Sequence, residues 1–206
     1  WRFPLEETIR AAAIRLLLHQ EVHPLLQEVL LHQLEEADRD ANAILYKPKD
    51  AYRTKGGASR TPSRTSGQNH PSGVVTHFYL KDFTEKDSVA LTYTKGADTL
   101  AHFSTYASDK DMKLSVKKGG NTHVWDTRGK EARRLPGMIL WLANLSWPKA
   151  VPGDYQVHLT TASGTQSERF KILPDPRAEV SVADMQKQHD FITDVNATVD
   201  RAHESI

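Results

Sequence analysis

The sequence predicts a mainly β fold, an antiparallel β-sandwich of about seven strands, with an N-terminal helical hairpin and a C-terminal helix. Short segments of alternating apolar and polar residues recur between residues 74 and 173, and glycine-containing turns separate them. At both ends of the chain, apolar residues repeat instead every three or four positions, as on one face of a helix. The sequence therefore predicts four regions: a helical hairpin at 1–46, a linker at 47–73, a sandwich at 74–174 and a C-terminal helix within 175–206.

Two amphipathic helices are predicted within residues 5–44. Pro24 separates them, because proline is tolerated in the first turn of a helix but not in its interior.

The segment HQEVH places His19 and His23 at a metal-ligand spacing, with Glu21 between them. The acid stands one place later than in the H-E-x-x-H motif, and Pro24 follows at once. We therefore favour exposed helix histidines over a metal site.

The linker at 47–73 is rich in proline, glycine, serine, threonine and basic residues and shows no apolar periodicity. This composition predicts a long loop, most mobile at 54–72, with a phosphate or sulfated-glycan site as the alternative. The loop lacks interleaved aromatic residues, so it does not indicate nucleic-acid binding. Its basic residues are Arg53, Lys55, Arg60 and Arg64.

Alternation and turn signals predict seven strands, with hairpin turns at Gly96 and Gly164. In the sixth strand, Tyr155, Val157 and Leu159 should point inward. The strands are expected at 74–80, 88–94, 100–106, 122–125, 138–142, 154–161 and 168–173.

The block from 121 to 160 organises the predicted sheets. Trp125 ends one strand, and Asp126 begins a polar turn that we expect to close through a hydrogen bond from its side chain to the backbone. Gly153 follows a proline and sets a tight corner just before Tyr155. We therefore predict structural roles for Trp125, Asp126, Gly153 and Tyr155.

A final helix is predicted to begin after Ser181, with Asp184 at capping-box spacing. The pattern still runs at Ala202, so we expect a further helix beyond it or docking of the N-terminal hairpin. Its inner face should contain Met185, Gln188, Ile192, Val195 and Val199.

Bulk properties exclude several functional classes. The formal net charge of +1 gives no global attraction to nucleic acid or anionic membranes. No apolar run approaches the roughly 20 residues that cross a bilayer. The chain has no cysteine, so disulfides and thiolate metal sites are excluded. No cofactor fingerprint is present, and we expect no cofactor. Because the chain begins at Trp1 rather than methionine, we expect a fragment or a processed product.

Several motifs follow one another in a family-like order: LYKPKDAYR (45–53), NHPSGVVTHFYL (69–80), GGNTHVWDTRG (119–129), LPGMILW (135–141), AVPGDYQVHL (150–159) and DPR (175–177). Together they resemble the C-terminal region of bacterial propeller proteins of the BNR-repeat, sortilin-like glycosyl hydrolase family. Within that region, NTHVWD…PGDYQVHL resembles the immunoglobulin-like domain of the flagellar hook-capping family.

This resemblance, over about residues 45–206, implies an immunoglobulin-like sandwich placed after a β-propeller in an exported bacterial protein. Any glycosidase activity would belong to the propeller, which this chain lacks. Residues 1–44 depart from the family pattern, since helices stand where the end of a propeller blade is expected.

Three other features are candidate functional sites. Trp141 and Trp147 flank a loop and, with Tyr155, could stack on sugar rings, although aromatic residues more often fill cores. Asn144 and Asn196 begin glycosylation sequons, which matter only in a eukaryotic secretory route. The acidic residues expected in solvated turns rather than in a hydrolytic pair are Asp82, Glu85, Asp87, Asp109 and Asp111.

The sequence thus favours a non-catalytic structural or interaction module that docks on a propeller domain or partner protein through its helical faces. A carbohydrate-binding module that uses Trp141, Trp147 and Tyr155 is the alternative. A hydrolase in its own right is the third hypothesis, and no arrangement of residues in the sequence nominates its catalytic groups.

Overall fold

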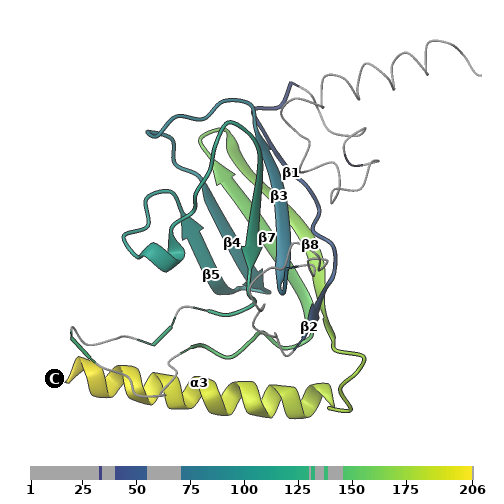
Figure 1. The fold of residues 1–206 in the computed structure, drawn as a ribbon, viewed down its shortest axis with the longest axis vertical. Helices are drawn as coiled ribbons and strands as arrows, with labels where there is room; N and C mark the ends of the chain where they lie inside the picture. Colours follow the sequence, from purple (N-terminus) through teal and green to yellow (C-terminus); the bar gives the residue numbers. More distant parts are fainter. Residues whose placement is uncertain are drawn as a thin grey trace, which may run out of the picture.

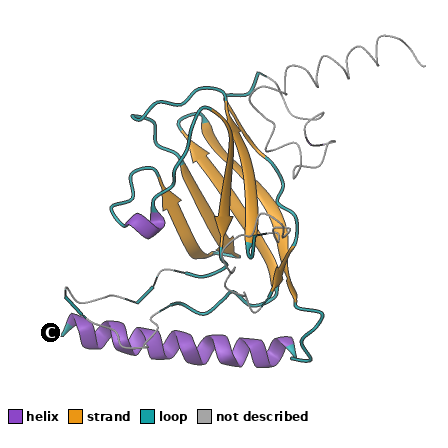
Figure 2. Ribbon diagram, viewed as in Figure 1, coloured by secondary structure: helices purple, strands orange, loops and turns teal. Residues whose placement is uncertain are grey.

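The computed structural model describes residues 33, 40–54, 71–129, 131–132, 137–138 and 146–205. Within them, eight strands form two sheets and one long helix follows (Figure 1). The strands make up the body of the molecule, with the helix beside it (Figure 2). The elements are β1 (Ala43–Leu45), β2 (Ala51–Arg53), β3 (Val74–Leu80), β4 (Ala90–Lys95), β5 (Asp98–Ser104), the 3₁₀ turn η2 (Lys110–Met112), β6 (Gly119–Trp125), β7 (Gly153–Thr161), β8 (Gly164–Pro174) and α3 (Val182–Glu204).

The smaller sheet has the strand order β1-β3-β6 and the larger one β2-β8-β7-β4-β5. All neighbouring strands are antiparallel except β2, which runs parallel to β8. The chain therefore leaves one sheet after β1 and joins the other at β2. The Gln166 side chain of β8 stabilises this crossing, since it accepts a hydrogen bond from the Leu45 amide (2.7 Å) and donates one to the Ala43 carbonyl (2.8 Å).

These two strands correct the predicted region boundaries. The helical hairpin was expected to extend to residue 46, but Ala43–Leu45 is a strand. The linker was expected to begin at 47, but Ala51–Arg53 pairs with β8. Both segments have three residues, which is too short to give a periodic signal, and their pairing partners lie far away in the sequence.

Six of the seven predicted strands are confirmed, and they correspond to β3 through β8. Alternation in β7 places Tyr155, Val157 and Leu159 in the core, as predicted. Gly96 and Gly164 form the β4–β5 and β7–β8 turns. The seventh strand, at 138–142, lies outside the described residues except for Met138, which is exposed and not in a strand. The two predicted N-terminal helices fall almost wholly on residues outside the described part. The same is true of residues 55–70 of the predicted linker.

Both sheets contribute side chains to one hydrophobic core. Tyr93 of β4 stacks on Trp125 of β6 with ring centroids 4.5 Å apart, so the contact joins the two sheets. The Tyr93 hydroxyl also lies 2.8 Å from Thr76 Oγ1 of β3. Burial raises the pKa of Tyr93 above its usual value, and this phenol stays neutral. One side chain thus combines an aromatic stack with a satisfied buried hydrogen bond.

Helix α3 begins as the sequence predicted and crosses beneath the ends of the strands (Figure 1). Ser181 is its N-cap, and the Asp184 amide donates to Ser181 Oγ at 3.1 Å. The buried residues of the helix are Met185 and Asn196. Gln188 accepts a hydrogen bond from Arg53 of β2, as expected for the predicted inner face, whereas Val195 is exposed, so the prediction is wrong for Val195. In the described part of the chain, no helix has the length and apolar character to cross a membrane.

Gly73, just before β3, and Gly164 offer a matched test of how closely the backbone at residue 73 packs against the end of β6. Gly73 has φ +132°, and a Cβ there would lie 2.2 Å from the Trp125 carbonyl oxygen. Gly164 has nearly the same angle, φ +131°, but open space around it. We expect Gly164→Ala to lower the free energy of unfolding by about 1–3 kcal/mol through backbone strain alone. Gly73→Ala should cost at least about 2 kcal/mol more. Urea unfolding measures both, and equal losses would contradict the close approach.

His123 predicts a pH dependence of stability. Its ring lies 4.3 Å from that of Phe103, and its Nε2 has no hydrogen-bond partner among the described residues. Burial lowers the pKa of His123 from 6.5 to about 4. Between these pH values the unfolded chain binds more protons than the folded one, so stability is complete above pH 6.5 and falls as the pH drops towards 4. The loss should reach at most about 3 kcal/mol.

The variant His123→Leu should flatten this pH dependence, since the titrating core group is gone. His102→Leu is the matched control, because His102 lies exposed on β5. Urea unfolding at several pH values from 7 to 4 measures the difference. An unchanged slope in the His123 variant would show that other groups govern the acid sensitivity.

Candidate functional site

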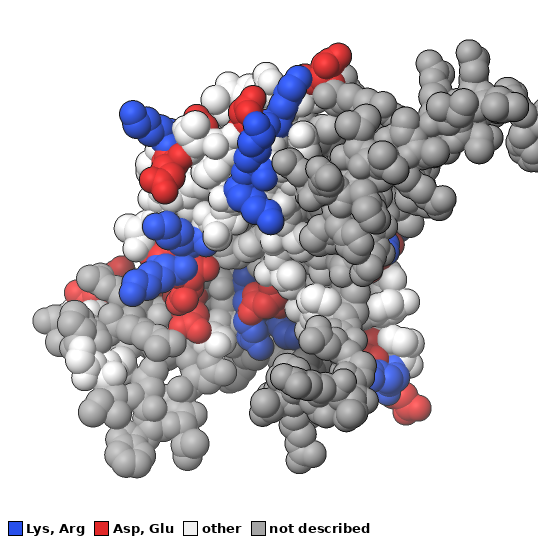
Figure 3. All heavy atoms as spheres, turned by 45° about the horizontal axis from the view of Figure 1, so that its top comes forward, with Lys and Arg blue, Asp and Glu red and all other residues white. Residues whose placement is uncertain are grey.

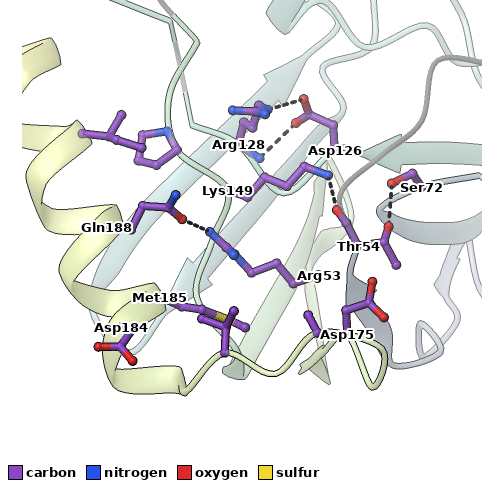
Figure 4. Close-up of a pocket in the computed structure, with 14 residues that line it drawn as sticks. Arg53, Thr54, Ser72, Asp126, Arg128, Lys149, Asp175, Asp184, Met185 and Gln188 are labelled. Carbon is purple, nitrogen blue, oxygen red and sulfur yellow. Dashed lines mark hydrogen bonds and ion pairs between the residues drawn. The ribbon is translucent and has the colours of Figure 1, made fainter.

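A cavity of about 800 Å³ lies where the ends of several strands face α3, and we call it the basal cavity (Figure 4). Five segments outside the helix and the first half of α3 enclose it. Its described lining consists of Arg53, Thr54, Ser72, Asp126, Arg128, Pro148, Lys149, Asp175, Ala178, Val180, Asp184, Met185, Gln188 and Ile192.

Local hydrogen bonds fix the turn that follows β6 at the cavity wall. The Arg128 amide donates to Asp126 Oδ1 at 3.0 Å, and Trp125 Nε1 donates to the Arg128 carbonyl at 2.7 Å. Thr127 between them has φ +68°, which is rare for a residue with a Cβ. Arg128 then pairs with Lys149 in an isolated β-bridge. This turn places the backbones of two basic residues side by side.

Three basic side chains, Arg53, Arg128 and Lys149, converge on the basal cavity (Figure 4). Arg53 comes from the end of β2 and donates through Nη2 to Gln188 Oε1 on α3 at 3.3 Å. Lys149 Nζ donates to the Thr54 carbonyl at 2.9 Å. Arg128 Nη1 donates to the Trp147 carbonyl at 2.5 Å. The acceptors of these three hydrogen bonds are neutral, so the bonds themselves do not compensate the positive charges.

Burial and mutual electrostatic repulsion lower the pKa of two of these three side chains, Arg53 and Lys149. Burial and then the neighbouring Arg128 lower the pKa of Arg53 below its usual value. Burial lowers the pKa of Lys149, with further lowering by Arg128 and Arg53, while Asp126 opposes the effect. On the face shown in Figure 3, basic and acidic side chains are interspersed. In the basal cavity the three basic side chains lie close enough to repel one another, although three acidic residues also line it.

Each acidic residue at the cavity is engaged by a partner of its own. Asp126 Oδ2 lies 3.7 Å from Arg128 Nε. Asp175 accepts two hydrogen bonds from the Arg177 guanidinium, at 2.9 and 2.8 Å, and these bonds lower the pKa of Asp175 to about 2. Asp184 accepts a hydrogen bond from Ser181 Oγ at 2.7 Å. No two of these carboxylates share a proton or an ion-pair partner.

The four residues predicted to have structural roles lie in the core, in a turn or at the start of a strand. Trp125 is 1% exposed, and Asp126 closes its turn as expected. The Tyr155 ring is 2% exposed, and its hydroxyl donates to the Val151 carbonyl. Burial raises the pKa of Tyr155 to about 12. Gly153 begins β7.

The other predicted site residues are dispersed. Trp147 is half-buried, and a Cβ at Gly129 would lie 3.0 Å from its Cδ1 atom. Because Tyr155 is in the core, the sugar-binding hypothesis depends on Trp147 and on Trp141, which lies outside the described residues. The amide nitrogen of Asn196 faces the Ser146 carbonyl at 3.4 Å, and the residue is 4% exposed, so this sequon is closed to a glycan.

The metal hypothesis concerns residues that the structure does not describe, since His19 and His23 are outside the described part. Among the residues described, no group of three or more histidine or acidic side chains could hold a metal ion.

Sequence reasoning missed most of the basal cavity. Arg53 was noted only as part of a basic loop, and Arg128, Lys149 and Gln188 were not considered as site residues. These four residues stand at separate positions along the chain, and no known anion-binding motif marks them. The parallel pairing of β2 with β8 and the Arg128–Lys149 bridge create the cluster, and neither has a signal in the sequence.

Comparisons of the chain with family models, curated proteins and solved structures gave no match.

Proposed function

We propose that this chain is an immunoglobulin-like β-sandwich that serves as a non-catalytic interaction module, and that α3 provides its docking surface. The observation that carries the proposal is the exposed apolar face of α3. Phe191 is 70% exposed and Val195 is 43% exposed, and their i,i+4 spacing places them on one side of the helix.

The strand order supports the immunoglobulin-like assignment. In that fold, a sheet with the first, second and fifth strands faces a sheet formed by the last, the sixth and the third strands. Here β1-β3-β6 and β2-β8-β7-β4-β5 have this arrangement, if β1 and β2 are taken as one first strand that changes sheets. The shared core of the two sheets is consistent with the facing layers of a sandwich.

Tyr155 supports the same assignment. Immunoglobulin-like domains often contain a tyrosine near the start of the sixth strand whose hydroxyl bonds to the backbone a few residues upstream. Tyr155 is the third residue of β7, and its hydroxyl donates to the carbonyl of Val151, four residues earlier.

The carboxylates of the basal cavity favour a binding role over hydrolysis. Glycoside hydrolysis requires two carboxyl groups on opposite sides of the scissile bond, one of them with a raised pKa. Asp126 and Asp184 are held by neighbouring side chains, and the pKa of Asp175 is lowered rather than raised. This pattern is typical of ion pairs that support a fold.

Burial on α3 is consistent with a helix that contacts partners on two sides. Its inner side contacts the β region through Met185 and Asn196. Its outer side presents Phe191 and Val195, an adjacent pair that a partner surface could cover. Export and a neighbouring propeller domain are further parts of the proposal, and they depend on the sequence resemblance.

A photo-crosslinking amino acid at Phe191 tests the docking surface in the cells that produce the protein. We expect one dominant adduct with a protein or with another domain of the same polypeptide, and we expect Val195→Asp to reduce its yield at least about fivefold. The physical reason is that a charge beside Phe191 must be desolvated on docking. Mass spectrometry identifies the adduct.

The control places the same crosslinker at Asp98, which is exposed in the β4–β5 hairpin. An adduct of equal yield from both positions, or one that is unaffected by Val195→Asp, would contradict docking through this face. Circular dichroism of each purified variant confirms that the fold is retained.

A further inference from the structure

Two basic side chains in the basal cavity, Arg53 and Lys149, have no carboxylate partner among the described residues. Among the described residues, the Arg53 side chain has one hydrogen bond, to the Gln188 amide oxygen, and its length of 3.3 Å indicates a weak contact. The Lys149 side chain likewise has one, to the Thr54 carbonyl. Burying positive charge without a counter-charge costs free energy. The side chains of Arg53 and Lys149 can therefore still donate hydrogen bonds to a bound anion.

The donors around these charges suit an oxyanion with several acceptor oxygens. Arg53 Nε is buried and has no acceptor in the described part of the chain. The hydroxyls of Thr54 and Ser72 also line the cavity, with their oxygens 3.3 Å apart. A guanidinium, an ammonium and two hydroxyls provide donors in different directions, which a tetrahedral group can use more fully than a planar one.

The carboxylates that line the cavity do not form ion pairs with Arg53 or Lys149. The Asp175 carboxylate is paired with Arg177, and Asp184 is bound by Ser181 at the start of α3. Asp126 lies beside Arg128, at 3.7 Å, and acts on Lys149 only from a greater distance, so neither Arg53 nor Lys149 has an ion-pair contact in the described part of the chain. Two uncompensated positive charges match a dianion better than a monoanion.

We propose that the basal cavity binds a tetrahedral oxyanion, a phosphate or sulfate group, between Arg53 and Lys149. The cavity of about 800 Å³ is much larger than the anion, so the group would be part of a small ligand whose remainder contacts the apolar wall. Val180, Met185 and Ile192 provide that wall. The proposal concerns the inner side of α3 and does not depend on docking at Phe191.

Titration of the purified chain with inorganic phosphate, sulfate and acetate, at constant ionic strength, tests the proposal. Isothermal titration calorimetry should show saturable binding of phosphate or sulfate and none of acetate. Each of Arg53→Met and Lys149→Met should weaken the binding about tenfold or more, because each removes a charge-assisted hydrogen bond. Lys86→Met is the control for the loss of one positive charge, since Lys86 is exposed in the β3–β4 loop. It should leave the binding unchanged.

Thermal unfolding without added anion separates a ligand site from a structural cluster. Arg53→Met should melt at the same temperature as the parent chain or higher, because it relieves repulsion from Arg128 and Lys149.

In the calorimetric titrations, a preference for phosphate would indicate a phosphorylated ligand. Equal or stronger binding of sulfate would indicate a sulfated one. The proposal is overturned if acetate binds as well as phosphate, if no anion binds saturably, or if both cavity variants bind like Lys86→Met.

Discussion

The contact between Tyr93 and Trp125 joins the two sheets, and the other features of the β region are arranged around it. Trp125 can reach Tyr93 only because β6 lies close to β3, where Gly73 leaves room for the Trp125 carbonyl. The Tyr93 hydroxyl needs a partner in the core, and Thr76 provides it. Neutral His123 lies beside the same ring. An aromatic core of this kind combines apolar area with a small number of satisfied polar groups.

The same tryptophan links the core to the candidate site. Its indole nitrogen holds the carbonyl of Arg128, and the side chain of Arg128 then reaches the Trp147 carbonyl. The backbone at the cavity wall is therefore anchored to the best-packed part of the molecule. Arg128 is held on this base, the β-bridge ties Lys149 to it, and Arg53 is held separately by the pairing of β2 with β8, so backbone movement cannot easily relieve their repulsion. A cluster held in this way can bind an anion without a large ordering cost.

Helix α3 has two distinct sides, and each supports a different proposal. Met185 lines the basal cavity, and Gln188 accepts the hydrogen bond that Arg53 donates to the helix. Phe191 and Val195 are exposed on the neighbouring side of the helix, at i,i+3 and i,i+7 from Gln188. Because one helix contributes to both surfaces, a partner that covered the outer side could stabilise the wall of the cavity.

Local chemistry determined part of this protein from the sequence alone. Alternation identified β3 through β8, Ser181 marked the start of α3, and the Asp126 turn followed from side-chain hydrogen bonding. Each of these signals depends on residues near one another in the chain. Only the tertiary structure decided the crossing from β1 to β2 and the meeting of Arg53 with Lys149, because both depend on pairing between segments far apart in sequence. Long-range strand pairing is set by the whole core, and no local pattern encodes it.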